Sequence, residues 1–192
     1  MEELVILCWN IRGVNKDTNR ANVKHTALKN QTNIICLQET KCSNWSQSMQ
    51  NDIWDVADHG WAIQNSEGFS GGLLTSWDKD LFEEVGVKTN KNWLWISLRS
   101  KNTGVKFHCV NIYAPQEPRE KREVWKALSI EFMKDELDPV CFMGDFNAIR
   151  SIEERKDCSY RRADTHDFNK FIKDLNLLEI PMSNDSFKLE KF

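Results

Sequence analysis

The segment "DPVCFMGDFNAI", residues 138–149, is unusual because an apolar run that resembles a buried strand ends abruptly in polar groups. The apolar run at residues 140–143 is typical of a buried strand, and Gly144, Asp145 and Asn147 follow it directly. Alternate residues of a strand face the same side, so Asp145 and Asn147 are expected on one face. Such residues at a single strand end usually form turns or cap helices, and this segment alone leaves that interpretation open.

Three other apolar segments also end in polar side chains. They are "LVILCWN" (4–10, ending in Asn10), "NIICLQE" (33–39, ending in Glu39) and "VKFHCVNIYAP" (105–115, carrying Asn111 and Tyr113). Helical patterns at 19–33 and 117–137 separate neighbouring strands, which predicts two β-helix-β units with parallel strands. The carboxyl ends of such strands lie on one rim of a sheet, where ligands usually bind. Strand alternation also predicts that Leu37 and Glu39 share a face.

Hairpins fill the middle of the chain, and a helix follows the 138–149 segment. The hairpin strands are predicted at 60–65 with 71–77 and at 92–100 with 105–115, the last helix at about 164–177, and a short strand at 186–192. Apolar strands that alternate with helices predict an α+β (α/β) fold, in which helices cover the outside of the sheets. No linker or repeat divides the chain, so a single domain over residues 1–192 is expected.

Composition is that of an ordinary globular protein with 192 residues and a net charge of -3. The six cysteines lack a CxxC pair, so we expect no zinc site, and most sit in apolar runs as small hydrophobes. The N-terminus lacks a signal-peptide pattern and no segment is long enough to cross a membrane. An intracellular location, nuclear or cytoplasmic, is therefore expected.

Two carboxylates and several amide or hydroxyl groups on one rim would form an oxygen-rich site. Mg²⁺ suits such a site because it takes one or two protein carboxylates and keeps positions for water and phosphate. The metal would polarise a phosphoryl oxygen, and a second carboxylate would accept a proton from attacking water. Gly144 would allow close approach of the backbone to the metal or the phosphate.

Five motifs in one order carry a family resemblance: "CWNIRG", "LQETK", "SGGLLTSW", "NIYAP" and "GDFNAI". Together they resemble the endonuclease/exonuclease/phosphatase superfamily, most closely the apurinic-endonuclease-like domain of plant LINE-type retrotransposons. The resemblance implies a four-layer αββα sandwich of two stacked mixed sheets with outer helices. It also implies hydrolysis of phosphodiester or phosphomonoester bonds with Mg²⁺ or Mn²⁺, and DNA as the substrate.

The resemblance also implies a role for each matching residue. Glu39 would be the principal metal ligand, with Asn10 supporting the metal shell and Asp145 joining it. Asp145 would also orient or deprotonate the attacking water, and Asn147 would position that water and the phosphate. Tyr113 would contact the scissile phosphate or a catalytic side chain. Asp145, Asn147, Tyr113 and Asn10 are thus the expected catalytic residues.

The family pattern continues beyond Phe192 with further strands and an "SDH"-like motif that carries the catalytic histidine. The resemblance therefore implies a domain that is incomplete at its C-terminal end, with an exposed sheet edge and with weakened or lost hydrolysis. Whether the chain is an enzyme stays open at this point. The alternatives are a catalytically dead remnant that binds nucleic acid or a partner, and a small-molecule phosphatase of the same fold. The sequence does not predict an oligomeric state.

Overall fold

A computed structural model describes residues 4–68, 70–134, 138–151 and 162–180. The chain forms two compact units, Met1–Asn147 and Ala148–Phe192. In the second unit, helix α4 (Arg162–Asp174) occupies most of the predicted helix at 164–177, and the Asn169 side-chain amide donates to the Arg150 carbonyl at 2.9 Å. The strand predicted at 186–192 lies outside the described residues.

The first sheet of the first unit begins with the predicted β-helix-β unit. Its strand order is β1 (Ile6–Asn10), β2 (Ile34–Gln38), β4 (Leu73–Asp78), β3 (His59–Gln64). Strands β1 and β2 are parallel, with Cys8 opposite Cys36, and helix α1 (Asp17–Lys29) connects them. The β3–β4 hairpin completes the sheet in antiparallel pairing, so the sheet is mixed.

The second sheet ends with the other predicted β-helix-β unit. Its strand order is β5 (Phe82–Asn90), β6 (Trp93–Ser100), β7 (Lys106–Tyr113), β8 (Val140–Asp145). Strands β5 to β7 are antiparallel neighbours, whereas β7 and β8 are parallel and helix α3 (Pro118–Lys134) connects them. In each sheet the parallel pair contains an edge strand, β1 or β8.

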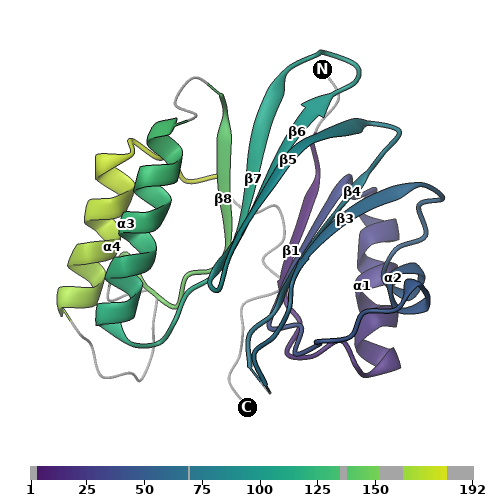
Figure 1. Ribbon diagram of the computed structural model, residues 1–192, viewed down its shortest axis with the longest axis horizontal. Coiled ribbons are helices and arrows are strands. Elements are labelled where there is room, and N and C mark those ends of the chain that lie inside the picture. Colours follow the sequence, from purple (N-terminus) through teal and green to yellow (C-terminus); the bar gives the residue numbers. More distant parts are fainter. Residues whose placement is uncertain (1–3, 69, 135–137, 152–161, 181–192) are drawn as a thin grey trace. The chain divides into compact units, whose positions relative to one another are not determined.

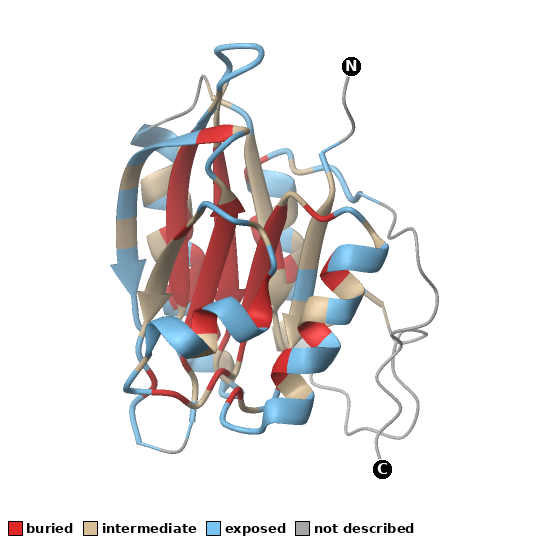
Figure 2. Ribbon diagram, turned by 90° about the vertical axis from the view of Figure 1, so that its right-hand side faces the viewer, coloured by how far each residue is buried: buried red, intermediate tan, exposed pale blue. Residues whose placement is uncertain are grey.

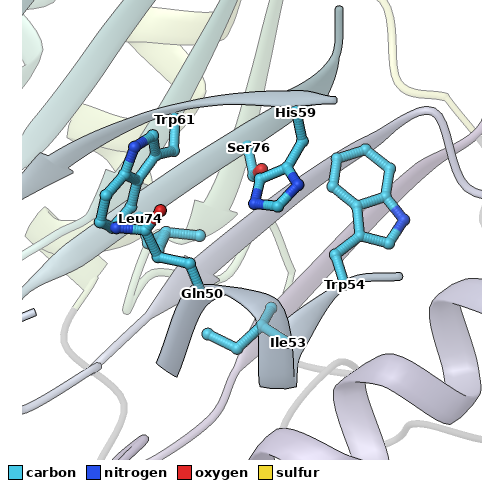
Figure 3. Close-up of a pocket in the computed structure, with 7 residues that line it drawn as sticks. All are labelled: Gln50, Ile53, Trp54, His59, Trp61, Leu74 and Ser76. Atoms are coloured by element: carbon cyan, nitrogen blue, oxygen red, sulfur yellow. The ribbon is translucent and has the colours of Figure 1, made fainter. Parts of the chain in front are cut away.

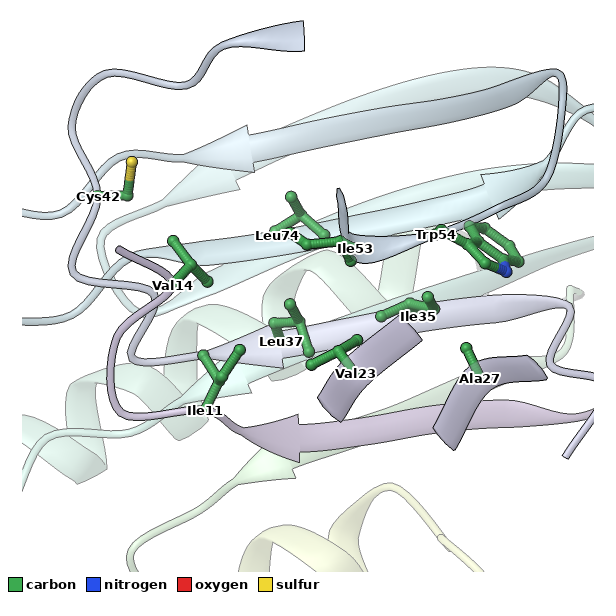
Figure 4. Packing of buried hydrophobic residues seen from close by; sticks show 10 residues of the cluster. All are labelled: Ile11, Val14, Val23, Ala27, Ile35, Leu37, Cys42, Ile53, Trp54 and Leu74. Carbon is green, nitrogen blue, oxygen red and sulfur yellow. The ribbon is translucent and has the colours of Figure 1, made fainter. Parts of the chain in front are cut away.

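The two sheets stack face to face, with α1 outside the first sheet and α3 outside the second (Figure 1). The buried positions concentrate in the central strands (Figure 2). Strand β2 is buried on both faces: Ile34 and Cys36 contact the second sheet, whereas Ile35 and Leu37 pack under the helices (Figure 4). This arrangement is the predicted α+β sandwich with outer helices.

The sequence patterns missed one helix and one strand. Helix α2 (Gln47–Ile53) has only seven residues, and its signal is the N-cap Ser46, which accepts from the Met49 amide at 3.2 Å. Strand β5 is an edge strand with mostly exposed side chains and a register shift between Glu84 and Gly86. A bulge interrupts the two-residue period, so strand alternation is not visible there.

None of the helices within the described residues has both the length and the apolar character that a membrane span needs.

Candidate active site

The carboxyl end of β2 turns Glu39 away from the face that strand alternation predicts. Leu37 packs under the helices, but Glu39 has a left-handed backbone with φ 51° and directs its carboxylate toward the second sheet. The prediction that Leu37 and Glu39 share a face is therefore wrong, because alternation ends where the left-handed turn begins. Such a conformation costs a non-glycine residue about 1–2 kcal/mol, and residues held this way concentrate at functional sites.

One amide nitrogen joins the two carboxylates of the site. Asn10 Nδ2 donates to Glu39 Oε1 at 3.1 Å and to Asp145 Oδ2 at 2.8 Å. Tyr113 OH donates to the same Glu39 Oε1 at 2.9 Å. Lys41 Nζ lies 3.3 Å from the other Glu39 oxygen. Four residues that the sequence proposes thus meet at the adjoining ends of β1, β2, β7 and β8.

Asn147, the fifth residue, lies in the turn after β8. Its backbone amide donates to Asp145 Oδ1 at 3.0 Å, and its own φ is 47°, again left-handed. Its side-chain nitrogen donates to the Ala114 carbonyl at 2.7 Å, and its side-chain oxygen accepts from Gln116 at 2.6 Å. The buried Lys121 of α3 donates to the Asn147 carbonyl. The turn is therefore fixed on several sides.

Gly144 serves the strand pairing rather than a ligand. It has φ 132°, and a Cβ at this position would lie 2.0 Å from the backbone oxygen of Ile112 on β7. Only glycine therefore allows β8 to pair closely with β7 one residue before Asp145. Strand β7 therefore lies where the sequence predicted a metal or a phosphate beside Gly144.

A buried polar network that the sequence did not reveal lies directly behind the site. Gln38, which precedes Glu39, donates to Asn111 Oδ1 at 2.7 Å across the two sheets. Asn111 Nδ2 contacts the carbonyl oxygens of Leu37 and Leu74 at 3.2 and 2.9 Å. Both amide side chains are almost completely buried. The sequence predicted Asn111 as one of the polar groups at the strand ends. The one sign of its buried role was a polar residue within an otherwise apolar strand.

The hydrogen bonds of the site keep Glu39 ionised. Burial acts to raise the pKa of Glu39, but hydrogen bonds from Asn10, Tyr113 and Lys41 outweigh burial and lower the pKa below its ordinary value. The pKa of Tyr113 is raised far above its ordinary value by burial, by its hydrogen bond to Glu39 and by the two carboxylate charges. Tyr113 therefore remains a protonated donor at neutral pH.

The donor set fits a hard divalent cation. Asn10 Oδ1 is buried, and within the described residues it has no hydrogen-bond partner, although its amide nitrogen contacts both carboxylates. A buried oxygen without a partner costs about 1–3 kcal/mol, and a cation would satisfy it. The described residues contain no cluster of three or more His, Cys, Asp or Glu side chains suited to a metal. An ion held by Glu39, Asp145 and Asn10 alone would keep several coordination positions for water and phosphate, as Mg²⁺ prefers.

The histidines of the first unit lie elsewhere. His25 is exposed on α1, and buried His108 pairs with Ser97 at 2.8 Å. His59 lines a small pocket between α2 and the outer face of the first sheet, beside Gln50 and Trp54 (Figure 3). That pocket is lined mainly by apolar and aromatic side chains and contains no carboxylate, so it has a different chemistry from the strand-end site.

Comparison with known proteins identifies the family. The Endonuclease/Exonuclease/phosphatase family model matches residues 7–181. Recombination repair protein 1 of Drosophila melanogaster is 26% identical over 152 residues, which cover 75% of this chain and 22% of that protein. The chain thus spans about a fifth of the length of this relative.

Solved structures share the fold. An AP endonuclease from Archaeoglobus fulgidus has a TM-score of 0.68 and 16% identity, with 89% of this chain and 70% of that chain covered. The mannosyl-6-phosphatase Bt3783 of Bacteroides thetaiotaomicron has a TM-score of 0.61 and 14% identity, with 76% of this chain and 66% of that chain covered. The chain therefore belongs to the endonuclease/exonuclease/phosphatase family.

Proposed function

We propose that the strand-end site hydrolyses phosphodiester bonds of DNA with a divalent cation, Mg²⁺ or Mn²⁺. The observation that carries this proposal is the position of Asn10 between the two carboxylates. Its nitrogen contacts Glu39 and Asp145, and its buried oxygen lacks a partner among the described residues. Carboxylate and amide oxygens are the ligands of hard cations, so Glu39, Asn10 and Asp145 would hold the ion.

The ion would polarise a phosphoryl oxygen and stabilise charge on the leaving oxygen. Glu39 supplies a carboxylate whose pKa is lowered, so it is charged and ready to bind at neutral pH. Tyr113 donates to Glu39 at 2.9 Å and fixes its orientation. Because its pKa is raised, Tyr113 keeps this proton at neutral pH. Its single O–H would have to leave Glu39 before it could donate to a phosphate oxygen.

Asp145 and Asn147 would handle the attacking water. Asp145 accepts bonds from Asn10 on one oxygen and from the Asn147 backbone on the other, which fixes its plane. A carboxylate held in this way can take a proton from water within hydrogen-bond reach. The side-chain nitrogen of Asn147 uses one hydrogen for Ala114, and its second hydrogen would be the one that orients the water or phosphate.

Two similarities support DNA as the substrate. The Archaeoglobus fulgidus protein is an AP endonuclease, and the Drosophila protein is a recombination repair protein. Within the family, the five sequence motifs support an origin in plant LINE-type retrotransposons. The five cysteines that the structure describes carry free thiols, which supports a reducing intracellular compartment, nuclear or cytoplasmic.

A phosphatase for small molecules is the second candidate, because the Bacteroides mannosyl-6-phosphatase shares the fold. A third possibility is a protein that binds DNA without cleaving it. No histidine of the first unit lies at the site, and the loss of one donor that stabilises a transition state costs about 2.7–4 kcal/mol of barrier. Slow turnover is therefore expected from the groups described here.

Nicking of supercoiled plasmid tests the proposal. The wild-type chain with Mg²⁺ should convert the plasmid to its open circle, and both Glu39→Gln and Asp145→Asn should abolish the reaction. Glu84→Gln is the matched control, since Glu84 is exposed on β5 at the opposite edge of the second sheet. An intact plasmid after long incubation with wild type would overturn hydrolysis of DNA, and release of phosphate from a monoester would then favour the phosphatase.

A further inference from the structure

The turn between β1 and α1 carries an exposed arginine beside the site. It spans residues 11–14, and Arg12 has a left-handed backbone with φ 53° while its side chain is exposed. Such a backbone costs an arginine about 1–2 kcal/mol. It persists only where the surroundings determine it.

Hydrogen bonds fix this turn to the end of β2. The Ile11 amide donates to the Gln38 carbonyl at 3.0 Å, and the Val14 amide donates to the Thr40 carbonyl at 2.9 Å. These bonds continue the parallel pairing of β1 and β2 beyond the strands. They enclose Glu39, so the turn and the metal-binding carboxylate form one local structure.

Side chains of α1 fix the other side of the turn. Asn19 Nδ2 donates to the carbonyl oxygens of Ile11 and Gly13 at 3.3 and 2.6 Å. The buried Arg20 donates to the Val14 carbonyl at 2.7 Å and also pairs with Asp52 at 3.1 Å. The turn is therefore rigid on both sides, and the Arg12 side chain projects from it.

The guanidinium group of Arg12 has no hydrogen bond or ion pair with any described residue. Lys41, a half-buried cation of the rim, pairs with Glu39 at 3.3 Å. Arg12 is nevertheless near the site, because it follows Asn10 by two residues and its turn is hydrogen-bonded to the neighbours of Glu39 on both sides. The rim thus contains a cation that pairs with no group in the part of the chain that the structure describes.

We propose that Arg12 binds a phosphate group of the substrate through its guanidinium fork, next to the metal-binding carboxylates. The inference rests on the proposed function, because it assigns a substrate contact to that same site. A planar guanidinium matches two oxygens of a phosphate and carries a permanent charge. We assign this phosphate to a DNA backbone. Free phosphate monoesters would offer the guanidinium the same pair of charged oxygens.

Binding of a fluorescein-labelled 20-base-pair DNA duplex, measured by anisotropy in EDTA over a range of NaCl concentrations, tests the proposal without cleavage. Arg12→Gly removes the charge and relieves the left-handed backbone, so it should fold at least as stably as wild type. Its affinity should fall about tenfold at low salt, and the magnitude of its salt slope should fall by about 0.9. Arg12→Lys should keep the slope but lose part of the affinity.

Lys29→Ala is the matched control, because it removes an exposed cation from the far end of α1. Equal affinities and slopes for Arg12→Gly, Lys29→Ala and wild type would overturn the proposal. If wild type binds inorganic phosphate through Arg12 but not the duplex, as phosphorus NMR would show, Arg12 is supported and the substrate is a small phosphate. If wild type binds neither the duplex nor inorganic phosphate, the proposed role of Arg12 is overturned. Arg12-dependent DNA binding without plasmid nicking overturns hydrolysis alone.

Discussion

The hydrogen bond between Gln38 and Asn111 should couple the two sheets directly behind the site. The bond is 2.7 Å long, joins β2 to β7 and is almost completely buried. Asn111→Ala removes a group that also donates to two backbone carbonyls, and it leaves the Gln38 amide without this acceptor. One buried unsatisfied group costs about 1–3 kcal/mol, and the lost volume adds to it. We expect the free energy of unfolding to fall by about 2–4 kcal/mol.

A double-mutant cycle isolates the coupling. Urea unfolding of wild type, Gln38→Ala, Asn111→Ala and the double variant gives four free energies. Their interaction energy should be about 1–2 kcal/mol, because the second substitution removes a partner that the first has already left unpaired. The slope of unfolding free energy against urea should stay constant across the four proteins.

The exposed pair Gln47 and Asn51 on α2 provides the matched control, since the same two side-chain types meet at 3.2 Å. On a solvated helix such a pair contributes about 0.2–0.5 kcal/mol. An interaction energy for Gln38 and Asn111 no larger than that of the control pair would show that this buried bond does not couple the two sheets.

Gly144→Ala should destabilise the protein by about 3–5 kcal/mol, because the added carbon would clash with the β7 backbone in a left-handed conformation; a urea midpoint equal to that of wild type would contradict this. Lys121→Met keeps the packing of the side chain but removes the donor to the Asn147 carbonyl, so stability should fall by about 1–3 kcal/mol, and plasmid nicking should slow as well. Tyr113→Phe should raise the pKa of Glu39, because it removes one of the hydrogen bonds that lower this pKa. The lowered pKa of Glu39 gives stability that is present above the unfolded pKa of about 4.3 and is lost as pH falls through the folded pKa. Urea midpoints should therefore fall less between pH 7 and pH 3 in the variant than in wild type.

Strand positions and the meeting of polar strand ends could be predicted from sequence, because apolar runs and intervening helices determine both. Tyr113 and Asp145 were placed correctly at the ends of parallel strands. The direction of Glu39 could not be predicted, since alternation says nothing about a left-handed residue after the strand. Strand β5 was hidden because its exposed edge and its bulge remove the two-residue period.

The buried groups that support the site were also beyond the sequence. Gln38 and Asn111 lie 73 positions apart, and only the stacking of two sheets brings them together. The strain in Arg12 depends on bonds from both β2 and α1, which no local pattern encodes. Motifs therefore predicted which residues meet at the strand ends, whereas tertiary contacts determine which residues hold them.

Glu39 and Asp145 should hold one divalent ion between them, and electron paramagnetic resonance of bound Mn²⁺ measures this binding without any reaction. We expect a single Mn²⁺ site in the wild-type protein, with affinity weakened at least about tenfold by either Glu39→Gln or Asp145→Asn and unchanged by Glu84→Gln. Equal Mn²⁺ affinity in all four proteins, or no bound ion in wild type, would contradict it.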